Sequence, residues 1–267
     1  MSFSAEWLAL REPYDLRARN AAVLDAVVAA FAGHPSIAIV DLASGTGSTA
    51  RALAPRLPAR QAWRLTDNDL GLLARASVAK VPERAQVTVV PFDLSLDLEA
   101  ALWAPVDLVT TSALLDLVSE GWLERLAVET AVRGLPVYAA LSYDGRVAFS
   151  PSDPADADII AAVNAHQRRD KGFGPALGPT AARAAVARFQ ALGHVVVQGT
   201  SDWVFGPSDQ QIQLEMCAGW AQAACETGIA KRDTARWLAR RHSAIDTGRS
   251  SIQVGHVDMF ARPTGTR

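Results

Sequence analysis

Residues 37–51 limit most strongly what this chain can fold into. The apolar, mostly β-branched run 37–40 predicts a strand that is covered on both faces. Gly45 and Gly47 follow, and because they lack a Cβ the backbone can turn sharply and a ligand can approach it closely. A serine and a threonine at 48–49 stand where a helix start needs caps for its first N–H groups. The stretch predicts a turn that holds a polar ligand against the backbone.

Two classes of ligand fit such a turn. The spacing Gly45-x-Gly47-x-x-Ala50, with Asp67 about twenty residues later, also matches the fingerprint of dinucleotide-binding proteins. Asp41 at the end of the strand argues against this, because its carboxylate would repel a pyrophosphate. A cation that carries a sulfonium and an ammonium group would be attracted instead.

The same strand-to-helix pattern recurs along the first half of the chain. Because strands and helices alternate, we expect an open parallel sheet with helices on both faces and a ligand at the carboxyl ends of its strands. The expected strands cover 37–42, 62–66, 85–92, 106–113 and 135–142, and the expected helices include 48–53, 70–79 and 120–132. Asp69 and Ser119 are the expected N-caps of the last two helices.

The segment Val40-Asp41-Leu42-x-x-Gly45-x-Gly47, followed in order by Asp67 and Asp93 at later strand ends, resembles the class I S-adenosylmethionine-dependent methyltransferases. The resemblance implies a doubly wound, mostly parallel seven-stranded sheet with an antiparallel last strand, in three α/β/α layers with helical cap additions. It also implies S-adenosylmethionine as the cofactor and S-adenosylhomocysteine as the product. The chain departs from the family at Ala43, where glycine is usual, so we expect a slightly wider turn with less room for the methionine part.

The resemblance also implies roles for individual residues. Asp67 would accept the ribose hydroxyls, Asp93 would hold the adenine amino group, and the N–H of Leu94 would meet a ring nitrogen. An aspartate in a strand-end turn is common in any sheet, which is the alternative for Asp93. The strand end near Thr111 would face the methyl group. The complete set of candidate cofactor-binding residues is Asp41, Ala43, Ser44, Gly45, Gly47, Asp67, Asn68, Asp93, Leu94 and Thr111.

Residues 1–34 are expected to form an N-terminal helical lid. A first helix would be interrupted at Pro13, and Asn20 would cap a second one. Arg11 and Tyr14 lie in a polar cluster between them and would contact the cofactor or the acceptor. The alternative is a solvated helix face without a functional role.

Residues 143–179 are expected to form an inserted cap segment with a helix at 155–165. The segment joins His166, Arg169 and Lys171 to a glycine-flexible loop, and these donors suit an acceptor that bears a carboxylate or phosphate. An exposed basic helix end is the alternative. We name Arg11, Trp122, Arg169 and Lys171 as candidate substrate-binding residues. His166, with a side-chain pKa near neutral, is the first candidate for a catalytic base, followed by Asp116 and Tyr14.

The C-terminal half, 180–267, completes a single domain whose cofactor-binding half is 35–142. We expect a helix at 181–192, a strand at 194–198, and a last strand at 251–261 that pairs with it in antiparallel fashion. Residues 203–205 would either continue the strand at 194–198 or start a bend. A helical insertion at 208–245 would begin at the capping box Ser208-x-x-Gln211, and Asp233 would cap its second helix.

Composition limits the possible partners. The 267 residues carry 26 basic and 28 acidic side chains, so no basic field favours nucleic acid or an anionic membrane. No signal peptide or membrane span is predicted, and the two cysteines, Cys217 and Cys225, indicate a reduced, cytoplasmic protein. Histidine and cysteine spacing predicts no metal site.

Together with the resemblance, these observations predict methyl transfer to a small soluble acceptor at oxygen, nitrogen or carbon. The alternatives are a nicotinamide-dependent oxidoreductase and an S-adenosylmethionine-binding protein without transferase activity. The sequence does not indicate an oligomeric state.

Overall fold

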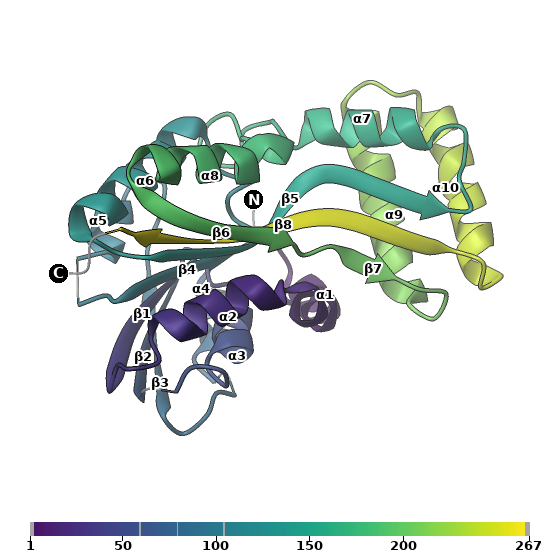
Figure 1. Ribbon diagram of the computed structural model, residues 1–267. Helices are drawn as coiled ribbons and strands as arrows, with labels where there is room; N and C mark the ends of the chain where they lie inside the picture. Colours follow the sequence, from purple (N-terminus) through teal and green to yellow (C-terminus); the bar gives the residue numbers. More distant parts are fainter. Residues whose placement is uncertain (1–2, 59, 79, 104, 265–267) are drawn as a thin grey trace.

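A twisted sheet with helices on both faces forms the body of the protein (Figure 1). The computed structural model describes residues 3–58, 60–78, 80–103 and 105–264. The strands are β1 (Ser36–Leu42), β2 (Arg60–Asp67), β3 (Ala85–Pro91), β4 (Leu108–Ser112), β5 (Val137–Ser150), β6 (His194–Thr200), β7 (Trp203–Phe205) and β8 (Ser251–Pro263). The α-helices are α1 (Ala5–Ala18), α2 (Ala21–Ala30), α3 (Ser48–Leu53), α4 (Leu70–Ala76), α5 (Leu98–Ala101), α6 (Glu120–Arg133), α7 (Asp156–His166), α8 (Ala181–Ala191), α9 (Gln210–Glu226) and α10 (Lys231–Asp246).

The strand order confirms the predicted sheet. It runs β3-β2-β1-β4-β5-β8-β6, with parallel pairing from β3 to β5. β8 is antiparallel to both of its neighbours, β5 and β6. Because the chain leaves β1 toward β2 on one side and later returns to β4 on the other, the crevice at the carboxyl end of β1 is the switch point where ligands bind in such sheets.

The sheet differs from the prediction at 203–205. These residues form an eighth strand, β7, that pairs with β8 beyond the end of β6 and does not continue β6. They can do so because β5 and β8 are much longer than predicted. β5 extends to Ser150 and pairs with β8 as far as Ser251, with register shifts along the way.

Two hydrophobic cores cover the two faces of the sheet. On one face, Val40 and Leu42 of β1 pack with residues of α5, α6 and α8. On the other, Ile37 and Ile39 of the same strand pack with residues of α2, α3 and α4. Neighbouring residues of β1 thus serve opposite cores, which explains why this strand is apolar at nearly every position.

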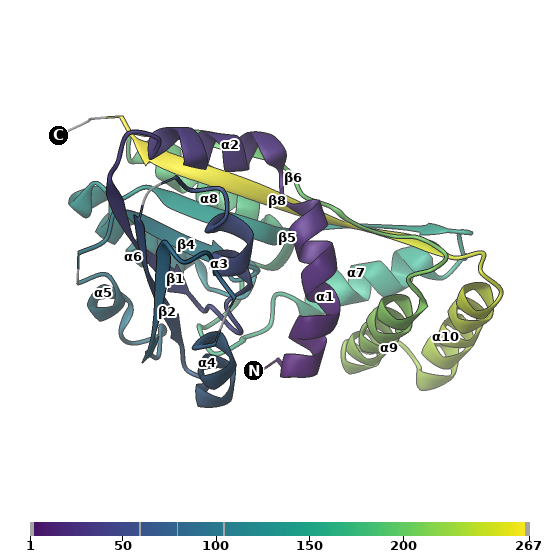
Figure 2. The ribbon, with the colours of Figure 1, turned by 90° about the horizontal axis from the view of Figure 1, so that it is seen from below.

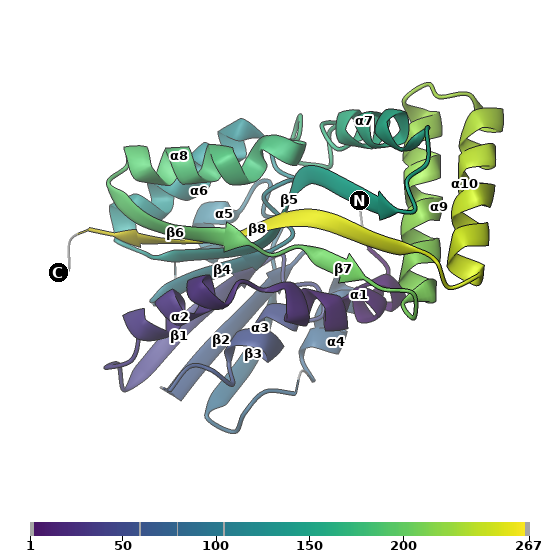
Figure 3. The ribbon, with the colours of Figure 1, turned by 45° about the vertical axis from the view of Figure 1, so that its right-hand side comes forward.

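The outer parts of β5 and β8 run past the rest of the sheet and carry their own core (Figures 1 and 3). α9 and α10 stand side by side at the far end of these strands, and α7 lies along them. Tyr143, Trp203, Phe205, Trp220 and Trp237 are buried where these elements meet. We call the outer parts of β5 and β8, together with β7, α7, α9 and α10, the extension.

Helix α1 lies at the junction between the sheet and the extension (Figure 2). The prediction that Pro13 interrupts it was wrong, because α1 continues through Pro13 to Ala18. Pro13 is exposed, whereas Arg11 and Asp15 on the same helix are buried. The contacts of the buried side outweigh the hydrogen bond that proline cannot donate.

Three of the predicted helix caps are confirmed by side-chain hydrogen bonds. Asn20 Oδ1, Asp69 Oδ1 and Ser119 Oγ accept from the first N–H groups of α2, α4 and α6. The predicted end of the second of these helices, Ala79, lies outside the described residues.

Two predicted caps in the extension were wrong. α9 begins after Asp209, whose carboxylate accepts from Tyr14 and from the N–H of Gly206. α10 begins after Ala230, which places Asp233 in the first turn beside Arg236. α9 therefore starts one residue later than a Ser208 cap requires, and the predicted cap of α10 takes part in an ion pair with Arg236 instead.

Candidate active site

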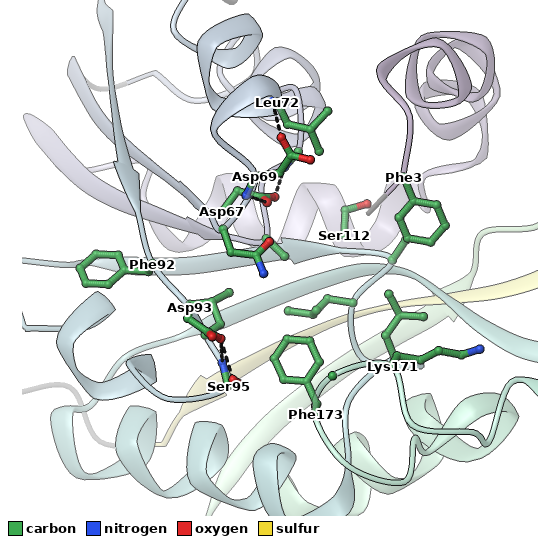
Figure 4. Close-up of a pocket in the computed structure, with 18 of the residues that line it drawn as sticks. Phe3, Asp67, Asp69, Leu72, Phe92, Asp93, Ser95, Ser112, Lys171 and Phe173 are labelled. Carbon is green, nitrogen blue, oxygen red and sulfur yellow. Dashed lines mark hydrogen bonds between the residues drawn. The ribbon is translucent and has the colours of Figure 1, made fainter. Parts of the chain in front are cut away.

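A cavity of about 290 Å³ lies at the carboxyl ends of β1 to β4, at the predicted switch point. We call it the strand-end cavity. In Figure 4, Asp67, Asp69, Phe92 and Asp93 lie on one side of it, and Phe3, Lys171 and Phe173 lie across from them. Its lining includes Phe3, Leu8, Arg11, Ala43, Gly45, Asp67, Asn68, Asp69, Leu72, Phe92, Asp93, Leu94, Ser112, Ala113, Leu117, Lys171 and Phe173.

Asp41 lies beneath the glycine turn and is fully buried. Its Oδ1 accepts a 2.7 Å hydrogen bond from the Thr110 hydroxyl, and within the described residues its Oδ2 has no partner. Burial raises the pKa of this carboxyl to about 7, against the effects of the Thr110 hydrogen bond and the Arg19 guanidinium. A nearby cation would favour the ionised form, so the position suits a positively charged ligand.

The glycine turn is held by a carboxylate. Asp67, at the end of β2, accepts from the N–H of Gly45 at 2.9 Å through Oδ2 and from the N–H of Asp69 at 3.0 Å through Oδ1. The N–H of Gly47 donates to the carbonyl of Ser44. The N–H groups of Gly45 and Gly47 therefore already donate to protein oxygens and are not free to hold a pyrophosphate.

The far side of the cavity is built on the end of β3. Asp93 is exposed, and its Oδ1 accepts from both the N–H and the hydroxyl of Ser95. The carbonyl of Leu94 accepts a 2.6 Å hydrogen bond from Trp122 Nε1. That indole also contacts Phe173 edge-on, with ring centroids 5.6 Å apart. Trp122 is thus a buried support of the cavity.

Ala43 adopts the backbone conformation that glycine would adopt at this position. Its φ is +51°, in the left-handed region. Alanine therefore carries the strain of a left-handed residue here, and the wider turn stays a prediction. Ala113, just after β4, and Leu141, within β5, also have positive φ, and both line the cavities of this site.

Replacing Ala43 by glycine should stabilise the protein. We expect Ala43→Gly to raise the free energy of unfolding by about 1 kcal/mol, since relief of left-handed strain exceeds the entropy that glycine loses on folding. Denaturant unfolding of the two proteins measures it. Ala62→Gly, at an exposed position of β2, is the matched control and should destabilise by about 0.5–1 kcal/mol. Destabilisation by both changes would show that Ala43 is not strained.

A second cavity, of about 490 Å³, adjoins the first and lies between α1 and the extension. We call it the extension cavity. Phe3, Arg11, Ala113, Leu117 and Lys171 line both cavities. The extension cavity is further lined by Ser4, Trp7, Asp116, Leu141, Tyr143, Val163, His166, Gln167, Trp203, Glu215, Met216, Gly219, Trp220, Ala223, Val254 and His256.

Asp116 lies in the turn after β4, where the two cavities meet. It is 6% exposed, and its Oδ1 accepts no hydrogen bond from the part of the chain that the structure describes. Burial raises the pKa of this carboxyl to about 6, although nearby backbone N–H groups, Arg11 and Lys171 act in the opposite direction. A buried carboxylate with a free oxygen and a pKa near neutral is suited to accept a proton.

Most of the predicted site residues converge. Ala43, Gly45, Asp67, Asn68, Asp93 and Leu94 line the strand-end cavity, and Ser44 lines a small recess beside it. Arg11 and Lys171 line both main cavities, and Asp116 and His166 line the extension cavity. Gly47 is the left-handed N-cap of α3, and Thr111 is buried with its hydroxyl on the carbonyl of Leu42. Gly47, Thr111 and Asp41 are not among the described residues that line the two main cavities and instead support the residues that do.

Three predicted residues do not join them. Among the described lining residues of the two main cavities, Tyr14, Trp122 and Arg169 are absent. The Tyr14 hydroxyl donates to Asp209, which ties α1 to the start of α9. Arg169 donates to the carbonyl of Glu226. His166 does line the extension cavity, but its Nε2 is 2.9 Å from Glu226 Oε2, so this ring is already engaged.

Sequence reasoning missed most of the extension cavity. Tyr143, Trp203, Trp220 and His256 come from three strands and a helix that are distant in the sequence. No local signal distinguishes them from core residues, because periodicity assigns such aromatic side chains to the core. In the described part of the chain, no group of three or more His, Cys, Asp or Glu side chains could hold a metal ion. No described helix is long and apolar enough to cross a membrane.

The residues of the strand-end cavity fit an adenosylmethionine better than a dinucleotide. Asp67 and Asp93 offer carboxylate oxygens for hydroxyl and amino donors. In the small recess, Ser44 Oγ is buried and without a hydrogen-bond partner among the described residues, as is Asp41 Oδ2 beneath it. Unpaired buried oxygens suit an ammonium group that can donate to them, whereas a pyrophosphate, which only accepts, would leave Asp41 Oδ2 without a partner.

Comparison with known proteins reveals likeness in structure alone. No family model and no curated protein matches the chain. A cyclopropane-fatty-acyl-phospholipid synthase-like protein from Lactobacillus casei is 13% identical, with 97% of this chain and 94% of that chain covered and a TM-score of 0.55. Two S-adenosylmethionine-dependent methyltransferases in complex with S-adenosylhomocysteine, from Thiobacillus denitrificans and Geobacter sulfurreducens, are each 14% identical. They cover 98% of this chain and 100% and 99% of their own, with TM-scores of 0.47 and 0.46. From its strand order and the likeness to the Lactobacillus casei protein, the chain has the α/β fold of the class I S-adenosylmethionine-dependent methyltransferases.

Proposed function

We propose that this protein transfers a methyl group from S-adenosylmethionine to a small acceptor molecule. The observation that carries the proposal is the glycine turn, which has carboxylates where an anion would need donors. Asp41 lies beneath this turn, and Asp67 accepts from its Gly45 amide. A sulfonium cofactor with an ammonium group complements this charge, and a dinucleotide does not.

The chain's residues would divide the two reactants between the two cavities. Asp67, Asp93 and the backbone near Leu94 would hold the nucleoside in the strand-end cavity. Asp41 and Ser44 would hold the amino-acid part near the recess. The acceptor would lie in the extension cavity, because that cavity is contiguous with the first through the residues that line both. Holding reactants in line supplies much of the rate of such a displacement.

Asp116 would take the proton of the acceptor. When bound, the cofactor supplies the methyl group: its S–CH3 bond breaks with the electron pair going to sulfur, and an acceptor lone pair forms the new bond to carbon. Asp116 Oδ1, free and buried where the cavities meet, then receives the acceptor proton and later releases it to solvent. His166 is a weaker candidate because it is paired with Glu226.

Calorimetry separates the proposed cofactor from its rival. The protein is titrated with S-adenosylhomocysteine, NAD and NADP, and we expect binding of the first alone. Release of S-adenosylhomocysteine from S-adenosylmethionine is then measured over a library of small acceptors. Binding of a nicotinamide dinucleotide without binding of adenosylhomocysteine would overturn the proposal. Adenosylhomocysteine binding without methyl transfer to any acceptor would favour an adenosylmethionine-binding protein that is not a transferase.

A further inference from the structure

We propose that the acceptor is an uncharged, flat aromatic molecule that presents an O–H or N–H group to Asp116. This inference rests on the methyl transfer proposed above and assigns a substrate class to the extension cavity. Its product would be an aryl methyl ether or an N-methyl arylamine. Three features support this substrate class: the aromatic rings of the wall, the free acceptor atoms at its polar end, and the charges around it.

Aromatic rings wall the extension cavity, and their polar atoms bind elsewhere. Trp203 Nε1 donates to Asp15 Oδ1 at 3.0 Å, and the Tyr143 hydroxyl donates to Asn164 Oδ1 at 2.7 Å. The hydrogen-bonding needs of both side chains are therefore met by the protein itself. What they offer to a ligand is ring surface, which packs best against another ring.

A further part of the wall is apolar and held in place. Trp220 of α9 is 7% exposed and packs edge-on against Phe149, with ring centroids 5.5 Å apart. Met216, one turn earlier on the same helix, and Trp7 of α1 also line the cavity. A methionine beside fixed aromatic rings adapts to a planar ligand without losing contact with it. A wall fixed before binding also lowers the ordering cost of binding.

The polar end of the cavity is at Asp116. Its Oδ1 is buried and accepts no hydrogen bond from the described residues, so it needs a donor from the ligand. His256 also lines the extension cavity, and its ring centroid is 4.6 Å from that of Trp203. Its Nδ1 is 3.0 Å from the carbonyl of Val254, which accepts only, so Nδ1 carries the proton and Nε2 is a second acceptor. Two acceptors match an O–H or N–H group.

The charges around the cavity favour an uncharged ligand. Arg11 is paired with Asp15 at 2.9 Å and lies over the Trp203 ring. Lys171 interacts electrostatically with Glu226 and Asp116. Of the three donors that the sequence indicated for an anionic acceptor, His166 and Arg169 both contact Glu226. The lining of the extension cavity carries two cations, Arg11 and Lys171, and two carboxylates, Asp116 and Glu215. Because neither sign of charge dominates, the wall does not select an ionic ligand.

The test uses the full chain saturated with S-adenosylhomocysteine and three probes of similar size. 2-Naphthol is aromatic with a donor, 2-methoxynaphthalene is aromatic without one, and trans-2-decalol is saturated with one. By calorimetry we expect 2-naphthol to bind about tenfold more tightly than either of the others, because only it uses both the rings and Asp116. Equal affinity for 2-naphthol and trans-2-decalol, or no binding of 2-naphthol, would overturn the inference.

Tryptophan variants locate the probe. Trp7→Leu and Trp220→Leu should each weaken 2-naphthol binding about tenfold and leave adenosylhomocysteine binding unchanged. Trp103→Leu is the matched control, since Trp103 is 82% exposed and outside both cavity linings in the described structure. Unchanged 2-naphthol affinity in both cavity variants would contradict the proposed site. Because adenosylhomocysteine is titrated separately, failure of the cofactor to bind would overturn the proposed function, whereas failure of 2-naphthol alone would overturn the acceptor class.

Discussion

Asp116→Asn is expected to lower kcat for methyl transfer by about 10²- to 10⁴-fold, the usual contribution of a general base. Asparagine keeps the size of the side chain but cannot accept the acceptor proton. Oδ1 of Asp116 is buried, unpaired within the described residues and located where the two cavities meet, so no bulk water replaces it directly. Initial rates of adenosylhomocysteine release, with the acceptor found in the library, measure the effect.

A pH profile distinguishes a proton-accepting role from a structural one. The pKa of Asp116 is raised to about 6, so kcat/KM should fall as the pH drops below 6, where the carboxyl becomes protonated and can no longer act as a base. This limb should disappear in Asp116→Asn. Asp158→Asn, at an exposed carboxylate on α7, is the matched control and should keep both rate and limb. An unchanged kcat in Asp116→Asn would remove Asp116 from the reaction.

Asp67→Ala should weaken binding of S-adenosylhomocysteine by about 1–3 kcal/mol, roughly 5- to 150-fold, through the loss of charged hydrogen bonds to the ligand. The same change frees the N–H of Gly45 and the N–H of Asp69, which now donate to this carboxylate. The variant therefore loses both the hydrogen bonds that hold the turn and the proposed contact with the ligand. Calorimetric titration of the variant measures the total.

A second variant separates these two contributions. Asp67→Asn keeps a carbonyl oxygen that can still accept from Gly45, so its loss of affinity should be smaller than that of Asp67→Ala. Asp97→Ala, at an exposed aspartate before α5, is the matched control and should leave affinity unchanged. Unchanged affinity in Asp67→Ala would show that Asp67 does not belong to the cofactor site.

The cofactor half of the site could be predicted because its residues follow strand ends. Asp41, Asp67 and Asp93 each come at or just after the end of a parallel strand, and parallel strands end at one edge of a sheet. Local sequence therefore placed them together without any knowledge of packing. Ala43 shows the limit of this reasoning, since its side chain gave no indication of the left-handed conformation that its backbone adopts.

The extension cavity could not be predicted because its geometry depends on contacts between distant segments. Tyr14 and Arg169 have the chemistry of site residues, but Asp209 and Glu226 hold them elsewhere. His256 and Trp203 enter the cavity only because β7 pairs with β8 beyond the end of β6. Periodicity identifies such residues as buried in a strand, but the direction of each side chain depends on where these strands pair.

Under the proposed function, the extension would separate substrate choice from cofactor binding within one chain. Its helices and outer strands supply most of the aromatic wall, whereas the glycine turn and its aspartates lie at the strand ends of the sheet. Substitutions or length changes in α7, α9 and the connections at the far end of β5 and β8 would therefore alter which molecule is accepted and leave the proposed cofactor contacts intact. This geometry would let new specificities evolve, or be engineered, by exchanging the extension while the sheet and its glycine turn stay unchanged.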